Sequence, residues 1–283
     1  MLDQLMKPLV KLWLRRYKKQ TVAPSVRAVF LGDAVSTDVI LHGAYERYEI
    51  DALTRYVFPN LPNESNCLDI GANIGNHTNS FSPYFKNVYA FEPNPIVQLI
   101  LRANTMGQNV QVIECGLSNQ KSKVPFMQLF ANLGASRITD QTTADGQSIQ
   151  VERLDDIVAS LGIKDVSFIK MDVEGHELQA LEGGIEFLKR EQPIIAMESF
   201  FKENPSTGKQ ITQILTNVGY SYFYELVPKS YIIRQLASTS FKRLFWWLIP
   251  AHWRKTLVLR RIETLDGIDC SMTISSCREL QIY

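Results

Sequence analysis

The amino-acid sequence predicts an α/β fold in which a doubly wound, mostly parallel sheet carries helices on both faces. Short apolar runs of strand length alternate with longer helical segments along most of the chain. Four of these runs end in or next to a carboxylate, namely Asp69, Glu92, Asp172 and Glu198. Because ligands of such sheets bind beyond the carboxyl ends of the strands, these acids are predicted to gather around one crevice.

The elements follow one another in chain order. A helix over residues 40–58 precedes a turn with Pro59 and Pro62, which leads into a buried strand over 68–70. A polar stretch over 132–148 predicts an exposed loop near the mouth of the site. The other predicted strands are 88–91, 110–113, 124–127, 149–151, 166–172 and 194–198; the other predicted helices are 76–85, 95–106, one capped by Asp155 or Asp156 that ends at Leu161, and one with Leu178, Leu181, Ile185 and Leu188 on its apolar face.

The composition favours a single domain with additions at both ends. With 283 residues and 45% apolar content, the chain can bury one large core. We expect a catalytic domain over 40–228, a basic amphipathic extension over 1–39, and a basic aromatic extension over 229–283 that packs on the core or completes it. Four scattered cysteines without metal-ligand spacing predict a reduced, cytoplasmic chain.

The charges are distributed unevenly. Residues 1–20 carry a net charge of +5 and residues 229–261 carry +8, so the remainder of a chain with net charge +1 carries −12. Both basic segments also contain apolar and aromatic side chains, which suits peripheral contact with the inner face of an anionic membrane. The alternative is that these stripes pack on the protein itself. Binding to nucleic acid is not expected, because no zinc-finger spacing or RNA-binding strand signature accompanies the charge.

The turn after the first strand predicts a nucleotide-like ligand. Gly71 and Gly75 allow a tight turn, and Glu92 follows at the tip of the next strand, where a carboxylate can bind two ribose hydroxyls. A dinucleotide pyrophosphate is usually held by G-x-G-x-x-G, whereas this chain has D-x-G-x-N-x-G with Asp69 at the turn. An acidic turn repels phosphate and suits a cation, which favours S-adenosylmethionine as the cofactor. A nicotinamide-dependent oxidoreductase or epimerase remains the alternative.

Six motifs in this order resemble the FkbM-type methyltransferases. They are G-A-Y-E at 43–46, L-D-I-G-A-N-I-G at 68–75, F-E-P-N-P at 91–95, L-D-D at 154–156, I-K-M-D-V-E-G-H-E at 169–177 and P-I-I-A-M-E at 193–198. The resemblance implies an S-adenosylmethionine-dependent O-methyltransferase on the Rossmann-like class I fold. Its acceptor would be a hydroxyl of a carbohydrate, including a lipid-linked or surface glycan, or of another secondary metabolite.

The resemblance also implies roles for individual residues. It places Asp172 and Glu174 at the methyl-transfer site and Glu92 on the ribose. The other implied cofactor-binding residues are Asp69, Gly71, Asn73 and Gly75 at the methionine end, Cys115, Gly116 and Leu117 at the adenine, and Tyr45 and Glu46 closing over the site from the first helix.

The acceptor hydroxyl must lose its proton during methyl transfer, so a general base is expected nearby. The candidates are Asp172, His176 and Glu198, and Asp172 is favoured because its strand adjoins the cofactor strand. No metal is expected, although Mg²⁺ held by Asp172 and Glu198 is an alternative way to acidify the hydroxyl. A non-catalytic module that recruits a glycan-assembly complex to the membrane is a further alternative, but it would not need acids at all four strand tips.

Overall fold

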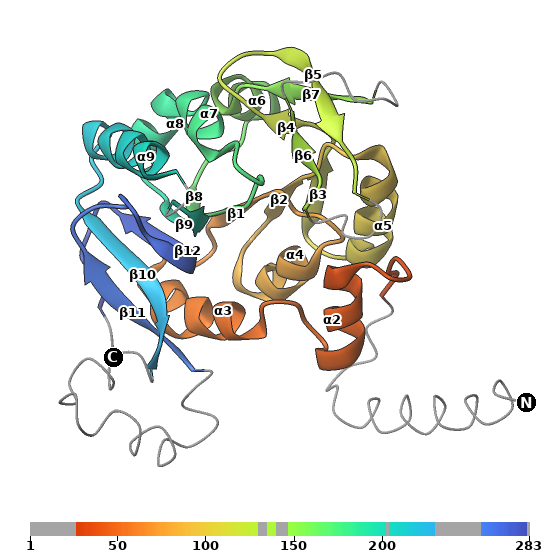
Figure 1. Ribbon diagram of the computed structural model, residues 1–283, viewed down its shortest axis with the longest axis horizontal. Coiled ribbons are helices and arrows are strands. Elements are labelled where there is room, and N and C mark those ends of the chain that lie inside the picture. The colour runs from red at the N-terminus through yellow and green to blue at the C-terminus, as the bar shows by residue number, and fades with distance from the viewer. Residues whose placement is uncertain (1–26, 130–134, 140–146, 202–203, 230–255, 282–283) are drawn as a thin grey trace, which may run out of the picture.

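The main sheet has eight strands in the order β11-β10-β12-β9-β8-β1-β2-β3 (Figure 1). The computed structural model describes residues 27–129, 135–139, 147–201, 204–229 and 256–281. In chain order the strands of this sheet are β1 Asn66–Ile70, β2 Val88–Phe91, β3 Val110–Ile113, β8 Val166–Met171, β9 Ile194–Phe200, β10 Tyr222–Pro228, β11 Leu257–Ile262 and β12 Asp269–Ser276.

The central strands of this sheet are parallel. β1 pairs in parallel with β2 and β8, and the outer neighbours β3 and β9 pair in parallel with β2 and β8 respectively. β12 lies between β9 and β10 and is antiparallel to both, as β11 is to β10. The predicted α/β fold with a mostly parallel sheet is therefore confirmed, and the sheet continues into strands beyond residue 228.

Helices cover both faces because the strands are buried on both sides. In β8, Phe168 packs with Phe81 of α4 on one face, whereas Ile169 packs with Leu181 of α7 on the other. Successive side chains of a strand point to opposite faces, so both faces need apolar cover. The helices are α2 Ala34–His42, α3 Arg47–Ala52, α4 Asn76–Phe81, α5 Pro95–Thr105, α6 Leu154–Leu161, α7 Glu177–Glu182, α8 Ile185–Glu191 and α9 Pro205–Asn217, together with a π-helical turn at Leu53–Val57 and 3₁₀ turns at Phe58–Asn60 and Ser82–Tyr84.

A small second sheet, in the order β4-β7-β5-β6, lies beside the carboxyl ends of the central strands (Figure 1). Its strands are β4 Gly116–Leu117, β5 Ser122–Met127, β6 Arg137–Ile138 and β7 Ser148–Glu152. The sequence predicts a loop over 132–148, but its described part contains β6, which pairs with β5. Phe126, Ile149 and Val151 form a separate apolar cluster beneath it.

Three predicted helices are shorter than the sequence pattern indicates. The helix expected over 40–58 is interrupted between α2 and α3, where Gly43 and Glu46 have φ of 86° and 51°. The helix expected over 76–85 passes into a 3₁₀ turn at Ser82, where the following Pro83 occupies the first turn. The helix expected through Leu188 is split at Gly183 and Gly184, where Gly184, with φ of −123°, begins α8. A side chain at Gly183 would meet the Ser118 carbonyl oxygen at 2.1 Å.

The predicted cap of α6 is wrong. Arg153, not an aspartate, occupies the N-cap position, and Asp155 lies in the first turn of the helix. The Asp155 carboxylate instead accepts a hydrogen bond of 2.8 Å from the backbone N–H of Phe187, in the first turn of α8. Asp155 therefore satisfies a free N–H of a neighbouring helix, which joins α6 to α8.

The basic segments predicted to contact a membrane lie largely outside the described residues, over 1–26 and 230–255. Within the described ranges, no helix has the length and apolar content required to cross a membrane.

Candidate active site

A cavity of about 130 Å³ opens at the carboxyl ends of β1, β2, β8 and β9. Its floor is formed by these strand ends, and the small sheet contributes Leu117, Phe126 and Ile138 to one wall. Tyr45, from the break between α2 and α3, contributes to another wall. The predicted crevice therefore exists, and three of the four strand-end acids, Glu92, Asp172 and Glu198, line it.

Glu92 is fixed by the backbone around it. Its two carboxylate oxygens accept hydrogen bonds from the N–H groups of Asn73, at 3.0 Å, and Asn94, at 2.8 Å. Burial raises the pKa of Glu92 to about 7, although these two hydrogen bonds oppose the shift. Each carboxylate oxygen can accept a second hydrogen bond, so Glu92 can still receive the two hydroxyls of a ribose.

Two further polar atoms beside Glu92 lack partners. Asn73 Oδ1 and Asn94 Nδ2 are both buried without a hydrogen bond, and both residues line the cavity. A buried polar atom left unpaired costs free energy, so such atoms in a cavity indicate a polar ligand. The donor and acceptor groups at this end therefore fit a ribose diol.

Gly71 and Gly75, the two glycines of the turn, are each required by a different close contact. Gly71 lines the cavity, but a Cβ there would lie 1.8 Å from the backbone oxygen of Asp172, so glycine is required for β1 and β8 to approach. Gly75 lies outside the cavity lining, where a Cβ would meet Leu101 Cδ1 at 2.9 Å. Its φ of 87° begins α4. The predicted cofactor contact of Gly75 is therefore not seen in the cavity lining.

Asp69 also lies behind the cavity wall and not in it. The side chain is fully buried, and its Oδ2 accepts a hydrogen bond of 2.5 Å from Thr78 Oγ1 of α4. Burial raises the pKa of Asp69, an effect that the charge of Lys170 and the Thr78 hydrogen bond oppose. Asp69 thus supports the turn through Thr78, and its direct contact with the cofactor stays a prediction.

Lys170 places a positive charge under the site. It is 2% exposed, and its Nζ lies 2.9 Å from Asp172 Oδ2. Burial opposes the charge, but the carboxylates of Asp172, Asp69 and Glu46 outweigh it and raise the pKa of Lys170. Burial would also raise the pKa of Asp172, yet Lys170 and a hydrogen bond with Glu198 hold it below its usual range. Asp172 is therefore ionised and already paired.

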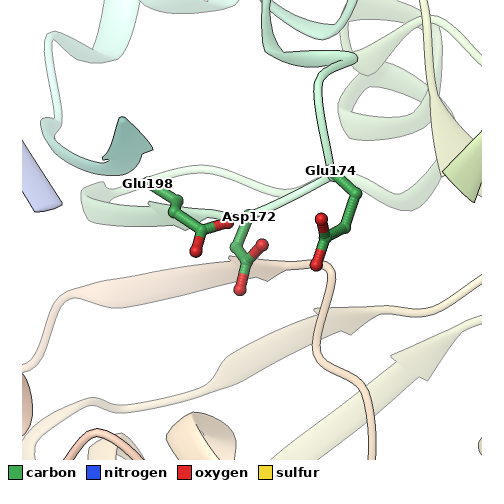
Figure 2. Close-up of side chains that lie close together, drawn as sticks. All are labelled: Asp172, Glu174 and Glu198. Atoms are coloured by element: carbon green, nitrogen blue, oxygen red, sulfur yellow. The ribbon is translucent and has the colours of Figure 1, made fainter. Parts of the chain in front are cut away.

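Asp172, Glu174 and Glu198 form a carboxylate cluster, shown in Figure 2. One oxygen from each lies within 4.8 Å of the others. Burial, and then the charge of Asp172, raises the pKa of Glu198 well above its usual range. The same two causes raise the pKa of Glu174 to about 7. The spacing of these oxygens would allow them to bind a metal ion together. Lys170 already neutralises Asp172, however, so we assign no metal to the cluster.

The wall formed by Tyr45 is fastened to α4. The side-chain amide of Asn76 accepts from the N–H of Tyr45 and donates to its carbonyl oxygen, both at 2.9 Å. Burial and the charges of Glu46, Glu198, Asp172 and Glu174 raise the pKa of the Tyr45 hydroxyl. Tyr45 lines the same cavity as the three carboxylates Asp172, Glu174 and Glu198.

Glu46 faces His77 next to this wall and is not part of the cavity lining. His77 Nε2 lies 3.4 Å from Glu46 Oε2, close enough for an electrostatic contact but without hydrogen-bond geometry. Burial raises the pKa of Glu46 to about 7, and burial together with Lys170 lowers the pKa of His77 to about 3. His77 is therefore a neutral imidazole that lines the cavity.

The residues predicted at the adenine all line the cavity on the side of the small sheet. Cys115 precedes β4, which Gly116 and Leu117 form. Burial raises the pKa of the Cys115 thiol to about 12, so it is a neutral contact. His176 lines the cavity nearby, and its Nε2 lies 3.0 Å from Ser118 Oγ.

Sequence reasoning missed several residues of this site. Lys170 stands two positions before Asp172, and in a strand that spacing places both side chains on one face, so the pair could have been found. Asn76 and His77 follow the glycine turn directly, and no sequence signal distinguished them from other residues in the first turn of a helix. Arg137 lines the cavity from a strand that the sequence did not predict.

The parallel sheet and the acids at its carboxyl edge agree with the Rossmann-like class I fold that the motifs imply. A model of the methyltransferase FkbM domain matches residues 69–222, more than half of the chain. The chain belongs to the FkbM methyltransferase family, as its motifs predict. The methyl donor is accordingly S-adenosylmethionine.

Individual relatives share shorter stretches. Methyltransferase sdnD of Sordaria araneosa is 29% identical, over 45% of this chain and 63% of that protein. Hexuronic acid methyltransferase AglP of Haloferax volcanii is 32% identical, over 41% of this chain and 48% of that protein. The chain thus spans less than two thirds of these relatives. The crystal structure of methyltransferase FkbM from Methylobacillus flagellatus KT covers 86% of this chain, and 52% of its own, with 21% identity and a TM-score of 0.46.

Proposed function

We propose that this protein transfers a methyl group from S-adenosylmethionine to a hydroxyl of a sugar or a glycan. The observation that carries the proposal is the cavity itself, which has a ribose-type carboxylate, Glu92, at one end and the carboxylate cluster at the other. Membership of the FkbM family supports methyl transfer, and it favours a sulfonium donor over the nicotinamide alternative.

When bound, S-adenosylmethionine supplies an electrophilic methyl group on a positively charged sulfur. Glu92 would hold the ribose through its two remaining acceptor positions, and Cys115, Gly116 and Leu117 would contact the adenine. The carboxylate cluster would attract the positive charge and accept a hydrogen bond from the acceptor hydroxyl. Methyl transfer is mainly a problem of alignment, so the fixed walls around the cavity contribute by holding the acceptor oxygen in line.

The acceptor class rests on the relative AglP, whose name states that it methylates a hexuronic acid. Arg137, which is exposed and lines the cavity, offers a cation for an acidic sugar. An alcohol acceptor has to lose a proton, and a carboxylate at the transfer site can accept it. An acceptor whose reacting atom is already anionic would be repelled by the same carboxylates, so a hydroxyl is favoured.

The cofactor can be tested before the acceptor is known. Calorimetric titration with S-adenosylhomocysteine should show binding to the wild type and weaker binding to Glu92→Ala. Methyl-label transfer to sugar nucleotides, uronic acids and lipid extracts would then identify the acceptor. Binding of reduced nicotinamide in place of S-adenosylhomocysteine would contradict the proposal, and donor binding without transfer to any hydroxyl would favour the non-catalytic alternative.

A cytoplasmic location with peripheral contact on the inner face of an anionic membrane extends this proposal. It is supported by the charge of +5 over residues 1–20 and +8 over 229–261 in the sequence. A lipid-linked acceptor would then lie beside the cavity. Flotation with anionic and neutral liposomes tests it: the full chain should float only with anionic vesicles, and truncation of the first 26 residues should reduce the floated fraction. Absence of flotation with either vesicle would remove this extension.

A further inference from the structure

The three carboxylates of the cluster differ in what already binds them. Asp172 receives Lys170 Nζ at 2.9 Å and shares a hydrogen bond with Glu198. Glu174 has no hydrogen bond or ion pair to its side chain from any residue within the described ranges. Asp172 and Glu198 thus already have partners in each other and in Lys170, whereas both oxygens of Glu174 can accept a hydrogen bond from a ligand.

The backbone holds Glu174 in the cavity. It has φ of 53°, an uncommon conformation for a residue with a side chain, and Gly175 follows with φ of 92°. The N–H of Gly175 donates to Glu177 Oε1 at 3.1 Å, which anchors the turn to α7. Residues held in such conformations occur where the surrounding structure fixes them, often at functional sites. Figure 2 shows the Glu174 carboxylate beside that of Asp172, at the same edge of the sheet.

The groups that face Glu174 come from every element around it. Acids predominate, so a positive charge on a ligand would be attracted and a loss of that charge would leave the cluster uncompensated. They are Asp172 and Lys170 of β8 and its end, Glu198 of β9, Glu177 of α7, Arg137 of β6, and Tyr45 and Glu46 between α2 and α3.

We propose that Glu174 accepts the proton of the acceptor hydroxyl, and that it becomes ionised when the positively charged methyl donor binds beside it. This inference rests on the proposed function and names the base that the sequence left open among Asp172, His176 and Glu198. Asp172 then serves as an ionised, Lys170-paired neighbour.

The transfer step balances in charge and atoms. The acceptor oxygen forms a bond to the methyl carbon as the carbon–sulfur bond breaks, and the electron pair of that bond stays on sulfur. The hydroxyl proton passes to a Glu174 oxygen. The positive charge on sulfur and the negative charge on Glu174 thus disappear together, so the net charge of the cavity is the same before and after.

The proposed ionisation of Glu174 should also be measurable when the methyl donor binds. Burial raises the pKa of Glu174 to about 7 in the free protein, so near pH 7 part of the molecules carry a proton on it. A nearby cation favours the ionised form and lowers that pKa, so donor binding releases this proton. S-adenosylhomocysteine carries the same amino acid and nucleoside but no sulfonium charge, and it should release much less.

Calorimetry tests the inference without an acceptor. S-adenosylmethionine and S-adenosylhomocysteine are each titrated at pH 7 in buffers of different ionisation enthalpy, whose heats report the protons released. The wild type should release a larger fraction of a proton with S-adenosylmethionine than with S-adenosylhomocysteine. Glu174→Gln should bind both ligands and lose this difference, whereas the exposed Glu263→Gln should keep it.

Each outcome has a separate meaning. Equal proton release with the two ligands, or a difference that survives in Glu174→Gln, would overturn the role of Glu174 and leave the proposed methyl transfer intact. Failure of the wild type to bind either ligand would instead overturn the proposed function. Binding of S-adenosylhomocysteine by Glu174→Gln shows that the variant is folded, so loss of proton release cannot be attributed to unfolding.

Discussion

The two ends of the cavity use carboxylates in opposite ways. At the Glu92 end, both oxygens are held by backbone N–H groups, so the side chain has one orientation and its remaining acceptor positions point to a ligand. At the other end, Glu174 has neighbours of like charge and no hydrogen bond of its own among the described residues. The first arrangement suits recognition, because its geometry is fixed; the second suits proton transfer, because both oxygens of Glu174 are open to a substrate.

This contrast shows how one sheet edge can bind and react with the same side-chain type. Hydrogen bonds to the charged form fix a carboxylate in place, whereas burial beside other acids makes its protonation respond to a ligand. Lys170 connects the two effects. It keeps Asp172 ionised, and burial together with the negative charge of Asp172 raises the pKa of Glu174 and Glu198, so these two acids take up protons first.

The largest effect is expected on methyl transfer when Glu174 is changed to Gln. The rate should fall by about 10²- to 10⁴-fold, which is the usual contribution of a general base. In the wild type, kcat/KM for the methyl donor should rise with pH to a plateau above about 7, since Glu174 must be ionised in the free enzyme. The variant should lack this rise. A fully active variant with an unchanged pH profile would show that the reactive end does not depend on this residue.

The next effect is on stability and concerns Lys170. Lys170→Met removes the buried cation and leaves the partly buried Asp172 without its partner, which should lower the free energy of unfolding by about 3 kcal/mol, measured with urea. Lys189→Met is the matched control, because Lys189 pairs with Glu186 at 3.0 Å on the surface and should cost about 0–1 kcal/mol.

A double variant sharpens this test. Lys170→Met combined with Asp172→Asn removes both charges, so it should be more stable than Lys170→Met alone. If the double variant were as unstable as the sum of the two single variants, the ion pair would not be the reason for the effect.

At the recognition end, Glu92→Ala should weaken S-adenosylhomocysteine binding by about 10- to 100-fold, the usual effect of losing a charge-assisted hydrogen bond. Calorimetry measures it, and Glu114→Ala, an acid on the exposed surface, should bind as the wild type does. Glu92 lies at the ribose end, and S-adenosylmethionine and S-adenosylhomocysteine share the ribose, so the loss of Glu92 should leave the difference in proton release between the two ligands unchanged. A changed difference would show that Glu92 takes part in the proton exchange, and the two ends would then not be separate in function.

A smaller effect is expected for Asn76→Ala, which removes both hydrogen bonds to the backbone of Tyr45. The loss should be about 1–2 kcal/mol and should appear as faster hydrogen exchange at the Tyr45 amide. Asn76→Asp keeps the acceptor but not the donor, so its exchange rate should fall between those of the wild type and Asn76→Ala. Equal protection in all three would mean that the wall is held by other contacts.

The smallest effect is expected from chelation. Because Lys170 already neutralises Asp172, EDTA should leave the rate of methyl transfer unchanged. If EDTA abolished methyl transfer and Mg²⁺ restored it, the carboxylate cluster would have to be interpreted as a metal site.

The sequence predicts the strands and their acids because both signals are local. An apolar run followed by a carboxylate marks β2 with Glu92 and β8 with Asp172, and the structure places both acids in the cavity lining. Helix ends were predicted less well. Gly43, with φ of 86°, ends α2 and could have been read as a stop signal, whereas the tight approach at Gly183 depends on Ser118, far away in the sequence.

What the sequence could not predict depends on distant partners. Nothing local indicates that Glu198 would share a hydrogen bond with Asp172, or that Glu174 would be the acid left without one. In the small sheet, the strands β5 and β7 are predicted by the sequence, but β6 is not, since it has two residues and forms only by pairing with β5. Which acid reacts is therefore a property of the assembled cluster.

The position of β12 has a consequence during synthesis. β9 carries Glu198, and its outer neighbour is β12, whose Thr273 hydroxyl bonds the Ser199 hydroxyl at 2.7 Å. β12 ends at Ser276 and is the last described strand, so a ribosome delivers this neighbour only after every other described strand has been synthesised. Nascent chains can therefore complete the nucleoside side early, while the reactive side waits for the last strand. A prematurely terminated product without β12 would lack the neighbour that supports the strand of Glu198.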